Sequence, residues 1–348
     1  MRAGWQLSES RRLETVHGAF DFRMAQDETS GTFAWLLTRG HVGTPEPLLA
    51  RVHSSCVTSE TFGGCDCDCA EQLDSALARI ASRGRGAFFY LFQEGRGEGF
   101  LAKARDRMLV QASGHRLTTF DAYAQMGLRP DARRYDAVAA IRELAEIQAP
   151  LLLLTNNPEK VAALELAAVC IADVELLDHA ASPFNHHYVV SKRRSGHRLT
   201  QAGAASGAAA LPEAVSVFSP RALPGAPHLM QHACYLLPVR VGGRAPDAPL
   251  WLRLHAYLDH ATGGERVALS IGDPRVAGAA VSVQEQVLLE RLSLRQAPTA
   301  DDWTRTLARF ADIGAGVAVF LPPGQSKAVA DPATSALLAY HGGASSRL

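Results

Sequence analysis

The sequence lacks a net charge, a secretory signal and any long apolar run. Lys+Arg and Asp+Glu both number 35 in 348 residues, so no global field would draw the chain to nucleic acid or to an anionic membrane. The N-terminus has no apolar stretch of the secretory kind. The strongly apolar runs, such as Leu151–Leu154, are far too short to cross a bilayer. We therefore expect a soluble, cytoplasmic protein that binds neither nucleic acid nor membrane.

The length of the chain suggests two domains. Composition changes near residue 200, where a stretch rich in Ala and Gly at 201–212 is typical of a linker. We accordingly expect one domain over residues 1–200 and a smaller one over residues 213–348.

Short strands and amphipathic helices alternate in the first 200 residues, which predicts a mixed α/β (α+β) fold with a mostly parallel sheet in its later part. The motifs described below follow strands, where open α/β sheets bind ligands. The expected strands are Gly18–Met24, Phe33–Arg39, Pro47–His53, Ala87–Phe92 and Leu151–Leu154, and the expected helices are Cys69–Ser82, Phe100–Gln111 and Asp131–Gln148, with a further helix opened by TNNPEK.

The C-terminal part resembles the N-terminal half. Leu307–Leu321 matches Leu77–Leu91 without a gap, and Leu288–Arg291 resembles Leu48–Arg51. We interpret residues 213–348 as a degenerate copy that lost its chemistry, because no cysteine cluster survives there. The alternative is that any strand–helix–strand unit with apolar periodicity looks similar.

Four of the six cysteines crowd into fourteen residues, at Cys56, Cys65, Cys67 and Cys69. In a reducing compartment such a cluster indicates a metal site rather than a disulfide framework. Alternation along an extended segment places both sulfurs of a C-x-C pair on one side. The spacing alone leaves two ligand sets open, Cys56/Cys65/Cys67 and Cys56/Cys67/Cys69, as well as a set of buried or redox cysteines.

A glycine-rich segment, Gln93–Gly99 (QEGRGEG), lies between a buried strand and a helix. Glycines let a backbone approach a ligand closely, and a helix start together with Arg96 suits a phosphate. A carboxylate such as Glu94 can accept hydrogen bonds from the two adjacent N–H donors of guanine. Alone, the segment is equally consistent with a flexible turn.

Two further motifs are weak when taken singly. Thr155–Lys160 (TNNPEK) follows a strand, and a helix N-cap alone is enough to explain it, although Lys160 could contact a phosphate. Asp131 and Arg133 could supply a base and a cation, or form a solvated helix start.

Together these motifs resemble the GTP cyclohydrolase II family. RVHSSC, CDCAEQL, QEGRGEG, GLRPDARRY, TNNPEK and NHHYVVSKRRSGH occur in the family's order, over roughly residues 14–200. The resemblance implies a zinc ion held by Cys56, Cys67 and Cys69, because C-D-C-x-x-Q-L selects the last two. It also implies Mg²⁺ on the nucleotide phosphates and a homodimer.

The resemblance further assigns roles at the nucleotide. It implies Asp131 as a proton acceptor and Arg133 as the group that faces the phosphate chain, as a nucleophile or its stabiliser. The substrate-binding residues that it implies are Arg51, Val52, His53, Ser54, Ser55, Gln72, Glu94, Gly95, Arg96, Thr119, Thr155 and Lys160.

The implied reaction is zinc-dependent opening of the guanine imidazole ring of GTP, with release of formate and pyrophosphate. The expected product is 2,5-diamino-6-ribosylamino-pyrimidinone 5'-phosphate, a riboflavin precursor. The sequence departs from the family at Arg107, where a tyrosine is usual, at Asp66, where a basic residue is usual, and at Phe92. Two alternatives follow: a reaction that stops at the formylaminopyrimidine nucleotide in a specialised pathway, and a non-catalytic nucleotide sensor or assembly subunit.

Overall fold

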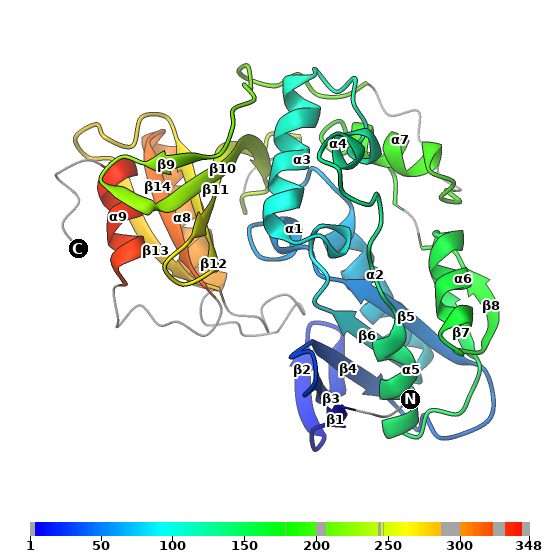
Figure 1. The fold of residues 1–348 in the computed structure, drawn as a ribbon. Coiled ribbons are helices and arrows are strands. Elements are labelled where there is room, and N and C mark those ends of the chain that lie inside the picture. Colours follow the sequence, from blue (N-terminus) through cyan, green and yellow to red (C-terminus); the bar gives the residue numbers. More distant parts are fainter. Residues whose placement is uncertain are drawn as a thin grey trace.

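The protein is described by a computed structural model that covers residues 4–177, 179–199, 207–242, 245, 247–286, 300–322 and 331–342. Within these ranges the strands form two sheets, one of eight strands and one of six. Figure 1 shows them as two lobes with helix α3 at their junction. None of the helices in the described ranges combines the length and apolar character that a membrane span requires.

The first sheet has the strand order β1-β3-β4-β6-β5-β7-β8, with β2 paired to β3. Its strands are β1 Trp5–Leu7, β2 Arg11–Thr15, β3 Gly18–Asp27, β4 Phe33–Arg39, β5 Leu48–Ser54, β6 Gly86–Leu91, β7 Leu151–Leu154 and β8 Ile171–Glu175. Pairing is parallel from β6 through β5 and β7 to β8 and antiparallel from β1 to β6. The mixed α/β fold is confirmed, and parallel pairing occurs where helices separate successive strands.

Helices cover both faces of this sheet. Leu73, Leu77 and Ile80 of α2 pack on one face, as their helical spacing predicts. Val138 and Ile141 of α5 pack on the opposite face. The helices of this half are α1 Val57–Glu60, α2 Cys69–Arg83, α3 Phe100–Ala112, α4 Thr119–Gln125, α5 Asp136–Leu144, α6 Pro158–Leu166 and α7 His186–Arg194, with a 3₁₀ turn, η1, at Gly95–Gly97.

The expected helix Asp131–Gln148 is wrong at its start, since α5 begins at Asp136. One local and one long-range hydrogen bond hold the segment from Asp131 to Arg133 out of the helix. The Asp131 carboxylate accepts from the backbone N–H of Arg133 at 3.1 Å, and the Ala132 N–H donates to the Arg96 carbonyl at 2.9 Å. Such side-chain bonds compete with helix formation. The predicted segment therefore becomes a loop beside the QEGRGEG motif.

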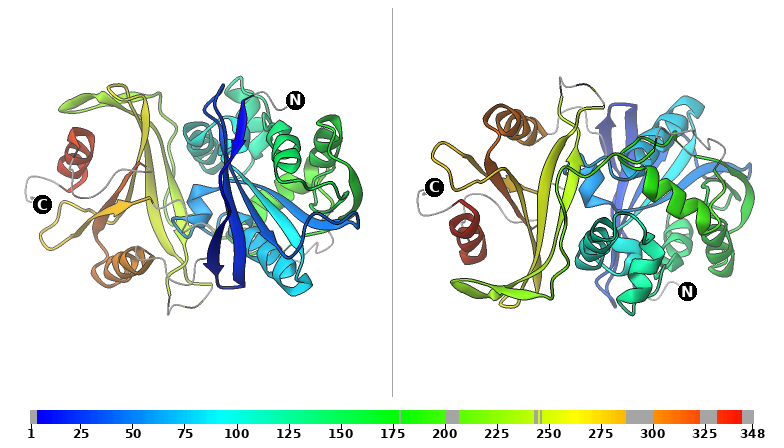
Figure 2. Two further views of the ribbon diagram at one scale, coloured as in Figure 1. Left: turned by 90° about the horizontal axis from the view of Figure 1, so that it is seen from below. Right: turned by 90° about the horizontal axis from the view of Figure 1, so that it is seen from above.

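The second sheet has the order β13-β14-β12-β11-β10-β9. Its strands are β9 Arg221–Leu223, β10 Ala226–Val239, β11 Leu250–Asp259, β12 Gly264–Ile271, β13 Ala280–Glu285 and β14 Gly316–Leu321, and its helices are α8 Ala300–Ile313 and α9 Pro332–Gly342. One face packs on α3 and α8, and α9 packs on the other. Figure 2 shows α9 on the side away from the first sheet.

Four strands of each sheet share one topology. The order β3-β4-β6-β5 and its directions recur in β11-β12-β14-β13, with parallel pairing only in the last pair. A Cβ on Gly40 would lie 2.4 Å from the Gly84 carbonyl oxygen, and one on Gly272 would lie 2.3 Å from that of Gly314. Both halves therefore need a glycine at the same crossing.

One expected correspondence within the repeat is wrong. The place of β5 beside β6 is taken in the second sheet by β13, which pairs in parallel with β14. The alignment of residues 288–291 with Leu48–Arg51 thus assigned β5 to the wrong segment, and residues 288–291 lie outside the described ranges. A short apolar run has too little pattern to fix its strand order.

Candidate active site

Three chain segments meet at the carboxyl edge of the first sheet. They follow the parallel strands β5, β6 and β7 and carry the RVHSSC, QEGRGEG and TNNPEK motifs. Neighbouring parallel strands end at the same edge, so these motifs converge although the first and the last are about a hundred residues apart in the sequence. A fourth segment, residues 131–133, reaches the site through Gly97, where a Cβ would lie 2.9 Å from the Ala132 carbonyl carbon.

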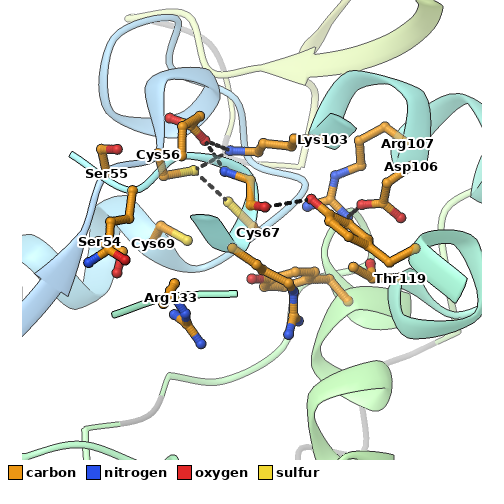
Figure 3. Close-up of a pocket in the computed structure, with 16 residues that line it drawn as sticks. Ser54, Ser55, Cys56, Cys67, Cys69, Lys103, Asp106, Arg107, Thr119 and Arg133 are labelled. Carbon is orange, nitrogen blue, oxygen red and sulfur yellow. Dashed lines mark hydrogen bonds and ion pairs between the residues drawn. The ribbon is translucent and has the colours of Figure 1, made fainter. Parts of the chain in front are cut away.

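Cys56, Cys67 and Cys69 form a tight cluster, with their sulfurs all within 4.8 Å of one another. The Sγ atoms of Cys56 and Cys67 are 3.6 Å apart, close to the roughly 3.8 Å that tetrahedral zinc with 2.3 Å bonds would impose. Figure 3 shows the three side chains converging. Cys65 instead donates to the Pro238 carbonyl at 3.4 Å. The geometry therefore favours Cys56/Cys67/Cys69 over the alternative set, and its donor chemistry fits zinc.

Lys103 lies beside this cluster and is a residue that the sequence reasoning missed. Its Nζ is 3.0 Å from Cys56 Sγ and 2.7 Å from Glu94 Oε1. Burial opposes its charge, but the Cys56 sulfur and the Glu94 carboxylate outweigh burial and raise the pKa of Lys103. Bonds from Cys67 and Cys69, together with Lys103, lower the pKa of Cys56. A thiolate is the form that binds a metal.

Two pockets adjoin at the cluster. The metal-end pocket is lined by the three cysteines, Ser54, Ser55, Gln93, Glu94, Gly95, Arg96, Lys103, Asp106, Arg107, Thr119, Tyr123, Arg133 and Tyr188. The cationic pocket is lined by Arg51, His53, Ser54, Cys69, Gln72, Arg96, Arg133, Thr155, Asn156, Asn157, Lys160, Tyr188, Lys192 and His197. Ser54, Cys69, Arg96, Arg133 and Tyr188 line both. The two pockets are therefore parts of one cleft.

The cationic pocket gathers more positive than negative side chains. Lys160 is buried, and burial together with Arg51 and Arg133 lowers its pKa well below the usual value. Lys192 is paired with Asp68 at 2.5 Å. A phosphate chain would relieve the mutual repulsion of these cations, so this end of the cleft suits a polyanion. Lys192 was also missed as a site residue, although it lies in the family-like NHHYVVSKRRSGH segment.

Arg133 lies between the two pockets and is paired with Asp131. Burial opposes ionisation of Asp131, but the hydrogen bond and charge of Arg133 lower its pKa. A carboxylate with a lowered pKa is a weak proton acceptor. In this conformation Asp131 therefore orients Arg133, and its expected role as a base requires the pair to separate.

Most of the expected substrate-binding residues line the cleft, but two expected site side chains do not. The Val52 side chain is buried in the core of the first sheet, and only its carbonyl oxygen reaches the site, where it accepts from Lys160 Nζ at 2.8 Å. Asp131 lines neither pocket. Other lining residues also have protein partners: for example, the Glu94 carboxylate accepts from the Val57 N–H, and Arg51 donates to Gln72 Oε1.

Arg107 forms a buried ion pair on the wall of the metal-end pocket. Its Nε is 3.0 Å from Asp66 Oδ2, and both side chains are 3% exposed. The guanidinium also lies 4.8 Å from the ring centroid of Tyr188. The two departures from the family pattern, at 66 and 107, are thus partners in space. Neighbouring Asp106 is buried, and burial raises its pKa to about 6.

Comparisons with known proteins identify the family to which the first half of the chain is similar. The family model described as GTP cyclohydrolase II matches residues 6–175. A GTP cyclohydrolase-2 of Acinetobacter baumannii (strain AB0057) is 37% identical over 191 residues, which cover 55% of this chain and 94% of that protein. The enzyme of the same name from Azotobacter vinelandii is 38% identical over 189 residues, covering 54% and 89%. That from Tolumonas auensis is 34% identical over 194 residues, covering 56% and 96%.

The fold and the cleft define an α/β enzyme with a cysteine cluster beside a cationic pocket. The chain belongs to the GTP cyclohydrolase II family, and it is a hydrolase of that type. The described second sheet lies beyond the part that the family model matches.

Proposed function

We propose that the protein hydrolyses GTP in a zinc-dependent reaction that opens the guanine imidazole ring and releases formate and pyrophosphate. The product would be 2,5-diamino-6-ribosylamino-pyrimidinone 5'-phosphate. The observation that carries the proposal is the three-cysteine cluster at the junction of the metal-end pocket and the cationic pocket. A nucleotide that spans the cleft would have its base near the sulfurs and its phosphates among the cations.

Each part of the cleft has a defined task in this proposal. A zinc ion held by three cysteines, with a fourth position open, would activate water for attack on the base. Lys103, whose Nζ lies 3.0 Å from Cys56 Sγ, would stabilise the thiolate. Arg96 and Arg133, which line both pockets, would hold the phosphate chain. Mg²⁺ would accompany the phosphates, since divalent cations bind the oxygens of nucleotide phosphates.

The test is an end-point assay of zinc-loaded protein with GTP and Mg²⁺, read by mass spectrometry and by a formate measurement. We expect formate, pyrophosphate and the diaminopyrimidine in equal amounts. A parallel assay of the Cys67→Ala variant, which loses one sulfur of the cluster, should give none of them. Unchanged GTP in the presence of the parent protein would refute the proposal.

Arg107 favours a second candidate, a reaction that stops at the formylaminopyrimidine nucleotide. The resemblance to the family implies a tyrosine at this place that assists the hydrolyses, whereas an arginine keeps its proton at all physiological pH values. Two tyrosines line the same pocket: Tyr188, whose ring faces the Arg107 guanidinium, and Tyr123, which donates its hydroxyl to the Gly95 carbonyl at 2.9 Å. In the same assay, a formylated product without free formate would support this candidate and refute full turnover.

We also propose that residues 213–348 are a degenerate, non-catalytic copy of the N-terminal half, joined by a linker at 201–212. The shared strand order and the paired glycines support this division. Among the described residues, the only cysteine of that half is Cys234. A homodimer stays a prediction, which light scattering of the purified protein would decide.

A further inference from the structure

The loop between two of the clustered cysteines touches the second sheet. We call residues 57–66, between Cys56 and Cys67, the metal loop. The Cys65 N–H donates to the Pro238 carbonyl at 2.9 Å, and the Arg240 N–H donates to the Gly63 carbonyl at 3.0 Å. Gly64 and Val239 form an antiparallel bridge. The end of β10 therefore holds the metal loop by backbone hydrogen bonds, as a neighbouring strand would.

Side chains close the same contact. Phe62 of the metal loop is fully buried, and its ring centroid lies 4.4 Å from that of Phe320 in β14. The indole N–H of Trp303, in α8, donates to the Phe62 carbonyl at 3.2 Å. A Cβ on Gly64 would lie 2.7 Å from Leu237 Cδ1. The metal loop is thus packed too closely against the second sheet to take another path without separating from it.

Helix α3 is held by the same strand. Gln111 Nε2 donates to the Leu236 carbonyl at 2.6 Å, and the Leu236 N–H donates to Gln111 Oε1 at 2.8 Å. This helix also carries Lys103, which contacts Cys56, and Arg107, which pairs with Asp66 of the metal loop. β10 therefore fixes both elements that surround the cysteine cluster.

We propose that the C-terminal half is a positioning unit for the cysteine cluster: β10 and Trp303 hold the metal loop and α3 so that Cys56 and Cys67 face one another. The role as a metal site rests on the proposed function, whereas the positioning of the metal loop does not. Groups behind a metal site commonly change its affinity by 10–100-fold, because they orient the ligands. This half has thus kept a structural task in the site even though it carries no cysteine cluster of its own in its described part.

The experiment compares two interface variants with a matched control in the full chain. Gln111→Met removes both bonds to Leu236, and Trp303→Phe removes the indole N–H while keeping an aromatic ring. The control is Tyr257→Phe, which removes a buried hydrogen bond of 2.7 Å to His341 on the opposite, α9-facing side of the same sheet. The measurements are hydrogen–deuterium exchange of peptides from residues 57–66 and the rate at which a chelator removes Co²⁺, followed by its thiolate absorption band.

We expect exchange in residues 57–66 to quicken in both interface variants, and cobalt release to quicken by about tenfold or more. The control should match the parent in both measurements. Exchange and release equal to the parent in both interface variants would overturn the proposal, as would an equal rise in the control. A parent protein that binds neither Co²⁺ nor Zn²⁺ would refute the metal role in the proposed function. The exchange of residues 57–66 would then still decide whether the C-terminal half positions the loop.

Discussion

The buried Asp66–Arg107 pair provides a sharp test of how the protein tolerates its departure from the family pattern. Replacing Arg107 with Met leaves the Asp66 carboxylate buried without its cation, since both side chains are only 3% exposed. Removing one partner of a buried pair typically costs about 3–5 kcal/mol. At about 2 °C per kcal/mol for a chain of this size, the thermal midpoint should fall by about 6 °C or more.

The double variant Asp66→Asn/Arg107→Met separates this charge effect from lost packing. In the double variant neither position 66 nor position 107 keeps a charge without its partner. The double variant should therefore be destabilised less than the sum of the two single variants, by at least about 2 kcal/mol. The matched control is the exposed pair Arg134–Asp136, with side chains 82% and 59% exposed, for which the coupling should be below about 0.5 kcal/mol. The assay is thermal unfolding of metal-free protein. Coupling at 66/107 no larger than at 134/136 would refute the reasoning.

Three further predictions concern single side chains. Burial raises the pKa of Asp106 to about 6, so the pKa of this carboxyl is higher in the folded protein than in the unfolded chain. The protein therefore loses stability as pH rises from about 4 to about 6, where the buried carboxyl ionises. Asp106→Asn should therefore gain stability over the parent at pH 8 but not at pH 4; equal differences in thermal midpoint at both values would contradict this. Cys65→Ala should keep the zinc content measured by atomic emission while Cys69→Ala loses it. The reverse result, with zinc lost from Cys65→Ala and kept by Cys69→Ala, would favour the other ligand set. Lys160→Met should weaken GTP binding about tenfold, about 1.4 kcal/mol in calorimetry. Because burial lowers the pKa of Lys160, the GTP affinity of the parent should fall as pH rises, whereas that of Lys160→Met should not depend on this group. A parent whose affinity varies with pH no more than the variant's would exclude a role of Lys160 in phosphate binding.

The local pattern of the sequence was enough to predict much of the first half. The bounds of α2 and α3 were predicted to within one residue, since amphipathic spacing and flanking glycines depend only on neighbouring residues. The family motifs identified the type of enzyme, because the residues that chemistry requires recur at characteristic spacings. The start of α5 could not be predicted, because the bond from Ala132 to Arg96 joins segments far apart in the sequence.

Only the tertiary structure decided which groups meet. The spacing of the cysteines left two possible ligand sets. In the folded chain Cys65 points toward the Pro238 carbonyl, 173 residues away, and so lies apart from the other three sulfurs. Lys103 is not part of any motif recognised in the sequence, yet its position on α3 places its Nζ 3.0 Å from Cys56 Sγ. Asp66 and Arg107 were two unrelated anomalies in the sequence and are one ion pair in space. Contacts of this kind depend on the packing of distant segments, which no local pattern encodes, whereas strand and helix propensities and the identity of reactive groups are properties of the sequence itself.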